Sequence, residues 1–372
     1  MPETLSADLV ALRERVAVLA TNRLVGLRDN TELTSSARAR LVRDASREAG
    51  LYAMAQPVSL GGEGASALAI VVVRDTLSQA GVGHLSGLYG STPGVLAGVG
   101  EPLRTTHLLA VLCGDKRAGF AFTEPFDAPR PTWAVVEGDQ LIVNGQKSYV
   151  TGGADADFVT ALVQIDGQGP AMVVIDLDSA GVALTRRFGT LDGSHHAAFS
   201  FRDVRVPQTH VVGSPGDGMS RAIGKISEVR LAIAADCVGT MSWIIELLTE
   251  HLLSPQRTKQ PAGAQERSRM RYGELRVATY AARSVLYRTA RLVDSGENAV
   301  NECIAAKAFA TEAAGKLVDT AIQIVGGEAL VEGHPFEAAI RRLRSVRLAE
   351  GETDQLYVNL ARGRLDLGLG RL

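Results

Sequence analysis

The chain has 372 residues with a formal net charge of −2, and 46% of the residues are hydrophobic. These values indicate an ordinary globular protein with a large core, and they exclude the basic surface that attracts nucleic acid or an anionic membrane. The N-terminus has no basic-then-apolar signal pattern, and no apolar run approaches the length of a membrane span, so we expect a cytoplasmic protein without a span. The three cysteines lie far apart, which predicts buried free thiols and no metal site.

Residues 1–115 predict an N-terminal helical domain, because Leu9, Leu12 and Val16 recur at helical spacing and an apolar helix follows over 65–77. Residues 116–222 change character and predict a middle antiparallel β-domain. The short β-type runs are 134–137, 141–143, 158–165, 171–175, 182–186 and 198–201. Tight turns between them are expected at Gly138-Asp139, Asn144-Gly145, Asp166-Gly167 and Asp192-Gly193.

Residues 223–372 return to helix and predict a C-terminal bundle domain, with helices over 223–253, 266–293 and 302–325. The last of these runs into Gly326-Gly327, which should end it, because glycine takes the left-handed C-cap conformation without a Cβ clash. Pro335 can open another helix at its first turn, and that helix should stop near Glu350-Gly351. It carries arginines that predict a salt-bridged surface or a subunit contact: Arg341, Arg342, Arg344 and Arg347.

Four short segments carry candidate chemistry, and each taken alone has a plain structural explanation. Phe120 to Pro125 can be a strand entering a turn, because the residue before a proline is extended. Asn144 to Thr151 begins with a hairpin pair. Gln323 to Gly327 is the end of a helix, and a lone glutamate such as Glu350 is far more often a solvated helix residue than a catalytic base. What is informative is the order of all four.

In that order and spacing, the segments resemble the signatures of the acyl-CoA dehydrogenase family. The resemblance implies an α+β, mainly helical fold: an N-terminal helical domain, a middle antiparallel β-domain and a C-terminal four-helix-bundle domain. It also implies FAD as the cofactor. The residues that it places against the cofactor are Phe120, Phe122, Thr123, Arg130, Tyr149, Val150, Thr151, Arg257, Gln323, Gly326, Gly327 and Glu352.

The same resemblance implies α,β-dehydrogenation of an acyl-CoA, or of an acyl-carrier thioester, to the trans-2-enoyl thioester. Glu350 would remove the α-proton while hydride leaves for flavin N5, and Glu228 ranks second as the base. Arg230 and Gly351 would bind substrate. The implied partners are an electron-transfer flavoprotein and further copies of the chain in a homodimer or homotetramer.

Three departures from the family pattern concern the cofactor. Residues 126–131 contain prolines in place of the usual Gly-Ser phosphate loop, and Arg130 is the candidate for a substitute phosphate ligand. Arg257 lacks the family's following aromatic, and Glu352 replaces a threonine. These departures leave two explanations open: FAD binds through substitute contacts such as Arg130 and Arg257, or the chain is a subunit of a heteromeric complex with an incomplete FAD site of its own. A flavin oxidase or monooxygenase on the same fold is a further alternative, against which the retention of Glu350 argues.

Overall fold

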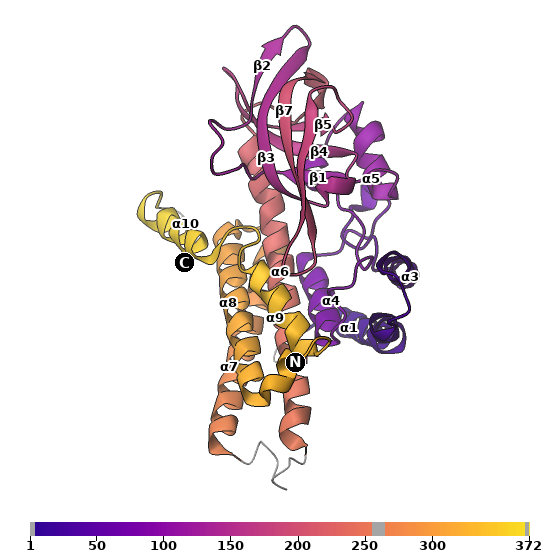
Figure 1. Ribbon diagram of the computed structural model, residues 1–372, viewed down its shortest axis with the longest axis vertical. Helices are drawn as coiled ribbons and strands as arrows, with labels where there is room; N and C mark the ends of the chain where they lie inside the picture. Colours follow the sequence, from indigo (N-terminus) through magenta and orange to yellow (C-terminus); the bar gives the residue numbers. More distant parts are fainter. Residues whose placement is uncertain (1–3, 255–264, 369–371) are drawn as a thin grey trace. The chain divides into compact units, whose positions relative to one another are not determined.

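The computed structural model describes residues 4–254, 265–368 and 372. Its contacts divide the chain into two compact units (Figure 1). One unit combines Met1–Gly90 with Ser227–Leu372, and the other is Ser91–Ile226. The N-terminal helices and the C-terminal bundle therefore fall into a single helical unit, and the β-strands fall into the second.

The helical unit begins with four α-helices and then continues with the bundle after residue 226. A π-helical segment, Ala20–Leu24, joins the first two helices. The N-terminal helices are α1 (Ala7–Leu19), α2 (Val25–Asp29), α3 (Ser35–Glu48) and α4 (Ala67–Gln79). The bundle helices are α6 (Gly218–Leu253, of which Ser227 onwards belongs to this unit), α7 (Glu266–Asp294), α8 (Val300–Val325), α9 (Pro335–Val346) and α10 (Thr353–Leu365).

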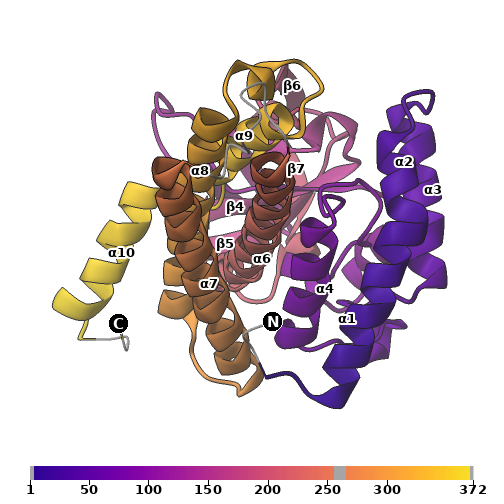
Figure 2. The same cartoon turned by 90° about the horizontal axis from the view of Figure 1, so that it is seen from below.

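Small residues let the bundle helices pack closely. Figure 2 shows α6, α7 and α8 side by side. Alanines such as Ala235, Ala282 and Ala314 are almost fully buried in one continuous core. A buried ion pair also links α4 to α7, because Arg283 donates to both carboxylate oxygens of Asp75 at 3.0 and 2.9 Å. The bundle core and the N-terminal helices thus form one packed body.

The longest helix, α6, corrects one expectation from the sequence. It contains an 18-residue window with a mean hydropathy of 1.6, which is long and apolar enough to cross a membrane by length and composition alone. Half of that window is buried inside the protein, as in the core helix of a globular bundle. The apolar run exists, and the bundle accounts for the buried part of it.

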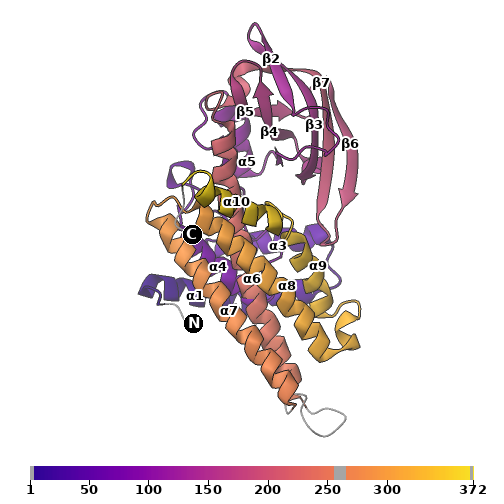
Figure 3. The same cartoon turned by 90° about the vertical axis from the view of Figure 1, so that its left-hand side faces the viewer.

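The second unit contains a mixed β-sheet, whose strands are labelled in Figure 3. Neighbouring strands follow the order β6-β7-β3-β2-β4-β5-β8, and β1 pairs with β4. The β1–β4 and β2–β4 pairs are parallel, so the sheet is not wholly antiparallel as the turn signals predicted. The strands are β1 (Ala118–Ala121), β2 (Trp133–Glu137), β3 (Gln140–Thr151), β4 (Phe158–Ile165), β5 (Gly169–Asp176), β6 (Val182–Gly189), β7 (His195–Pro207) and β8 (Val211–Val212).

The Asn144-Gly145 pair does not form the predicted turn. It lies inside β3, where the register with β7 shifts between Val143 and Gly145, and Gly145 has a φ of +138°. The side chain of Asn144 bridges the bulge by accepting from the Asp203 amide at 3.0 Å and donating to the Asp203 carboxylate at 3.1 Å. A β-bulge uses the same residue types as a turn, which is why the two are confused in sequence. The other three predicted turns fall between strands.

Both ends of the segment between α8 and α9 follow the sequence signals. α8 ends at Val325, and Gly326 caps it with φ +88° and ψ −162°, a glycine conformation other than the left-handed helical one that we expected. Pro335 is in the first turn of α9. However, α9 ends at Val346, and residues 347–351 form an irregular turn that carries Glu350.

Candidate active site

Glu350 lies in a strained turn of the helical unit. Its φ is +55°, which is uncommon for a residue with a side chain, and Gly351 follows with φ +105°. Such backbone strain persists only where the surroundings hold it, and it concentrates at functional sites. The side chain of Glu350 is half-buried.

Two cations from neighbouring helices hold this turn by its main-chain carbonyl oxygens. Arg230 of α6 donates through Nε to the Glu350 carbonyl at 2.9 Å. Lys307 of α8, fully buried, donates through Nζ to the carbonyls of Gly351 at 2.7 Å and Arg347 at 3.0 Å. Burial lowers the pKa of Arg230, and burial lowers the pKa of Lys307 to about 8. α6 and α8 therefore each bury a basic side chain that holds this one short turn in position.

A third anchor is the carboxylate of Glu312 on α8. It accepts from both ends of the turn: from Arg347 Nε at 2.8 Å and from Thr353 Oγ1 at 2.7 Å. Burial alone would raise the pKa of Glu312, but these hydrogen bonds outweigh it and lower that pKa. The turn is thus fixed before, at and after Glu350, as precise placement of a catalytic group requires.

The two other glutamates that the sequence analysis considered, Glu228 and Glu352, differ from Glu350. Glu228 is exposed on regular helix α6, two residues before Arg230. Glu352 is the exposed N-cap residue of α10, where its charge is favourable next to the positive end of the helix. Gly351 cannot readily be replaced, because a Cβ there would lie 3.0 Å from Leu356 Cδ2 and 3.4 Å from the Arg230 guanidinium. Of these three glutamates, only Glu350 has a positive φ and lies in a turn that several side chains hold in place.

The Gln323-to-Gly327 segment is on the surface of the same unit. Gln323, Gly326 and Gly327 are all exposed. A Cβ on either glycine would meet nothing within 4 Å, so neither glycine is required by packing inside the chain. The segment offers accessible backbone groups, which suits contact with a ligand or with another chain.

On the sheet unit, the Thr123 segment is fixed by a buried lysine. Lys147 of β3 donates to the Glu124 carboxylate at 2.8 Å and to the Phe122 carbonyl at 3.3 Å. The Ser148 amide donates to the Thr123 carbonyl at 2.9 Å, and the Thr123 side chain remains exposed. Burial lowers the pKa of Lys147. Sequence reasoning missed Lys147 as a positioning residue, although its motif contained it.

The residues that follow Lys147 alternate between surface and core. Tyr149 is 61% exposed with φ +52°, and Thr151 is also exposed. Val150 between them is fully buried in the sheet core, so it offers a ligand only its backbone. His196 of β7 extends this surface, since its Nδ1 lies 3.3 Å from Thr151 Oγ1. An exposed aromatic ring beside a hydroxyl is a surface on which a flat ligand can lie.

Phe120 and Phe122 form another aromatic surface, with stacked rings whose centroids are 5.8 Å apart. Both side chains are half-buried. Arg130, the candidate phosphate ligand, is already engaged: its guanidinium lies 3.4 Å from the Asp166 carboxylate and 4.4 Å from the ring centroid of Trp133. Arg257 lies outside the described residues. The residues that the sequence predicted for the site are thus distributed over both units.

Comparison with known proteins agrees with this fold. A model of the acyl-CoA dehydrogenase C-terminal domain matches residues 216–365. An acyl-CoA dehydrogenase of Bacillus subtilis is 25% identical over 362 residues, which cover 93% of this chain and 95% of that protein. The chain belongs to the acyl-CoA dehydrogenase family. Enzymes of this family are oxidoreductases that act on the CH–CH group of acyl-CoA.

Two further similar proteins are a subunit of a reductase complex and a solved structure. Subunit CarC of the caffeyl-CoA reductase-Etf complex of Acetobacterium woodii is 26% identical over 331 residues, covering 85% of this chain and 87% of that one. The structure of a Bacillus anthracis acyl-CoA dehydrogenase complexed with FAD superposes with a TM-score of 0.83 at 22% identity, covering 99% of this chain and 68% of that chain. The latter likeness concerns the fold.

Proposed function

We propose that this acyl-CoA dehydrogenase catalyses the α,β-dehydrogenation of an acyl-CoA thioester, with Glu350 as the base that takes the α-proton. The observation that carries the proposal is the strained turn, which three side chains from α6 and α8 hold around this single carboxylate. A base must meet a fixed carbon atom, and a fixed backbone supplies that precision.

FAD is the cofactor that fits the surfaces described. The exposed ring of Tyr149, the Thr151 hydroxyl and the exposed Thr123 side chain, which all belong to the sheet unit, would hold its ring system. When bound, FAD accepts the hydride that leaves the β-carbon. The chain's own contribution is to orient the thioester, to exclude water and to hold the proton at the Glu350 carboxylate.

The test is the visible spectrum of the purified protein during anaerobic addition of a series of acyl-CoAs. Yellow protein should bleach with at least one thioester. Glu350→Gln should retain the flavin but bleach at least a thousandfold more slowly, whereas the exposed controls Glu228→Gln and Glu352→Gln should bleach normally. If Glu228→Gln is the slow variant instead, the base has been misassigned. Equal bleaching by all four proteins would exclude a glutamate base in this set.

A second reading, a subunit of a heteromeric complex, is favoured by one observation. Arg130 is paired with Asp166 and stacked on Trp133, so it does not present the free guanidinium that would replace the missing phosphate loop. If a partner chain supplies those contacts, the protein expressed alone will be colourless and will take up little added FAD. Colour should then appear on mixing with the partner. The relationship to a subunit of an Etf complex supports an electron-transfer flavoprotein as the electron acceptor in either case.

A further inference from the structure

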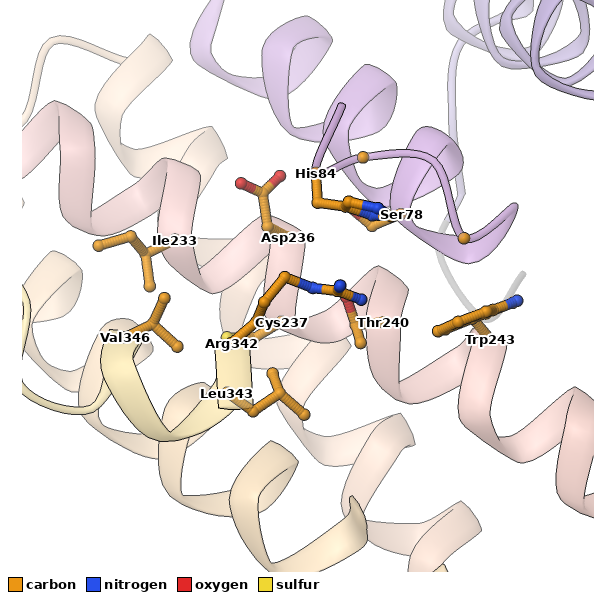
Figure 4. A pocket seen from close by; sticks show the side chains of 12 residues that line it. Ser78, His84, Ile233, Asp236, Cys237, Thr240, Trp243, Arg342, Leu343 and Val346 are labelled. Atoms are coloured by element: carbon orange, nitrogen blue, oxygen red, sulfur yellow. The ribbon is translucent and has the colours of Figure 1, made fainter. Parts of the chain in front are cut away.

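The helical unit contains a partly open cavity of about 130 Å³ that is lined by three of its segments (Figure 4). The residues that matter come from the loop after α4, from α6 and from α9: His84, Ile233, Asp236, Trp243, Arg342 and Val346. Its volume is comparable to the ~150 Å³ of an engineered cavity that holds benzene, so about six non-hydrogen atoms would fit. Charged side chains line part of it, unlike an ordinary packing defect.

Apolar side chains lie at both sides of the cavity. Ile233 and Val346 lie together at one side of the view in Figure 4, and Trp243 lies at the other. The Trp243 ring packs so closely on Gly81 that a Cβ there would be 2.6 Å from a ring atom. Ile233 follows Arg230 by one helical turn, and Val346 comes just before the turn that carries Glu350. Both residues of the Ile233–Val346 end are therefore close in sequence to the residues that hold or form the catalytic turn.

The charges around the cavity do not cancel. Asp236 is paired with Arg74, whose Nη1 lies 2.7 Å from Oδ2, so these two residues neutralise each other. Burial together with the charge of Arg342 lowers the pKa of His84 to about 3, which leaves this imidazole neutral. Among the described residues, no carboxylate lies within ion-pairing distance of Arg342, because Glu337 pairs with the neighbouring Arg341 at 2.7 Å. The charge of Arg342 is therefore not balanced by a carboxylate among the described residues.

We propose that this cavity receives the far end of the acyl group and that Arg342 binds a carboxylate there, so that the preferred substrates are CoA thioesters of dicarboxylic acids. The inference rests on the proposed function, whose substrate class it narrows. An arginine and a carboxylate form strong, directional hydrogen bonds inside a protein. A plain alkyl end would instead leave the guanidinium desolvated without a partner, which is costly. The Ile233–Val346 end would pack against the methylene groups in between.

Binding can be tested without catalysis, because Trp243 is a built-in reporter. The chain has two tryptophans, and Trp133→Phe leaves Trp243 as the single one while keeping an aromatic ring beside Arg130. Titration of this variant with adipate should give a saturable change in tryptophan emission, and 1,6-hexanediol should give none. Arg342→Gln in the same background should weaken adipate binding at least tenfold. Arg344→Gln, an exposed arginine on the same helix, should leave it unchanged.

Three results of this titration would overturn the proposal. They are the absence of a saturable change with adipate, an equal affinity in the Arg342→Gln variant, and equally tight binding of inorganic phosphate. The last result would show a general anion site that does not select carboxylates. Circular dichroism of each variant establishes that it is folded before its titration is compared.

Turnover separates the failure of this inference from the failure of the proposed function. For chains of equal length, kcat/KM for the ω-carboxyacyl-CoA should exceed that for the plain acyl-CoA at least tenfold, and Arg342→Gln should collapse the ratio mainly through KM. If no thioester bleaches the flavin, the proposed function fails while the titration still reports on the cavity. If plain acyl-CoAs bleach it equally well with and without Arg342, only the dicarboxylic assignment fails.

Discussion

Arg230 Nε lies 2.9 Å from the carbonyl oxygen of Glu350, so the arginine holds this residue by its main chain. The contact joins α6 to the turn after α9, and it acts on the one residue of that turn whose backbone has an unfavourable positive φ without being glycine. Arg230 is therefore a positioning residue for the proposed base.

Removal of this contact should slow catalysis more than it weakens binding. In Arg230→Met the Glu350 carbonyl loses its buried donor, and a shift of the turn by about 1 Å would cost on the order of 100-fold in kcat. Stopped-flow bleaching of the flavin measures the rate, and the concentration dependence gives KM. Arg344→Met, an exposed arginine on α9, is the matched control. A rise in KM with unchanged kcat would instead assign Arg230 to substrate binding.

Lys307→Met should destabilise the fold as well as the turn. The substitution keeps the length of the side chain but leaves two partly buried carbonyl oxygens, of Arg347 and Gly351, without this donor. Each unsatisfied group costs about 1–3 kcal/mol, so the free energy of unfolding should fall by about 2–4 kcal/mol. Urea denaturation measures this change. Lys316→Met, exposed on the same helix, should have an effect below about 0.5 kcal/mol, and a similar loss in both variants would contradict the assigned role.

Glu350→Gly should make the protein more stable while it abolishes activity. Glycine adopts a φ of +55° without strain, so the change should remove a cost of about 1–3 kcal/mol and, after the added flexibility of the unfolded chain, leave a net gain of about 1 kcal/mol. Thermal unfolding should show a higher Tm. Glu352 has a φ of −62° and no such strain, so Glu352→Gly should not raise the Tm. An unchanged Tm in Glu350→Gly would mean that the turn stores no strain.

The Glu124–Lys147 pair predicts an acid-sensitive sheet unit. Burial would raise the pKa of Glu124, but the hydrogen bonds from Lys147 and Thr132 outweigh it and lower the pKa below the ordinary value. The folded state therefore binds a proton less readily than the unfolded state. The stabilisation is fully present above the ordinary glutamate pKa and is lost as the pH falls through the lowered folded value.

Glu124→Gln tests this sign directly. At pH 7 it should lower the free energy of unfolding by about 3 kcal/mol, because the buried Lys147 loses its partner. At pH 3 the difference from the wild type should shrink, since the wild-type carboxylate is then being protonated. Denaturant titrations at both pH values provide the comparison. A difference that stays constant with pH would assign the effect to lost packing.

Local signals predicted those parts of the fold that depend on single residues. The start of α9 at Pro335 and the end of α8 before Gly326 were confirmed, because each residue has a conformational property independent of its surroundings, although Gly326 does not take the left-handed helical conformation that we expected. The Asn144-Gly145 turn was wrong, because the choice between a turn and a bulge depends on the partner strand and on Asp203. The parallel pairing of β1 with β4 also depends on residues distant in sequence.

The same distinction applies to the candidate site. Glu350 was found through a resemblance, but Lys307 carries no local signal, and its role follows only from the packing of α8 against the turn. The cavity likewise joins His84, Asp236 and Arg342, which are separated by more than a hundred residues at each step and meet only in the folded unit. Arg342 was expected on a bundle surface, and it lines a cavity instead.

The open space around Gly327 means that the fold of the chain does not by itself require glycine at this position. A methyl group there would touch nothing in its own chain, and its φ is not among the positive values that demand glycine. Drift to alanine or serine would therefore leave the fold intact. If related chains keep glycine at this position, the reason lies outside the fold, in a cofactor or a neighbouring subunit that would occupy that space.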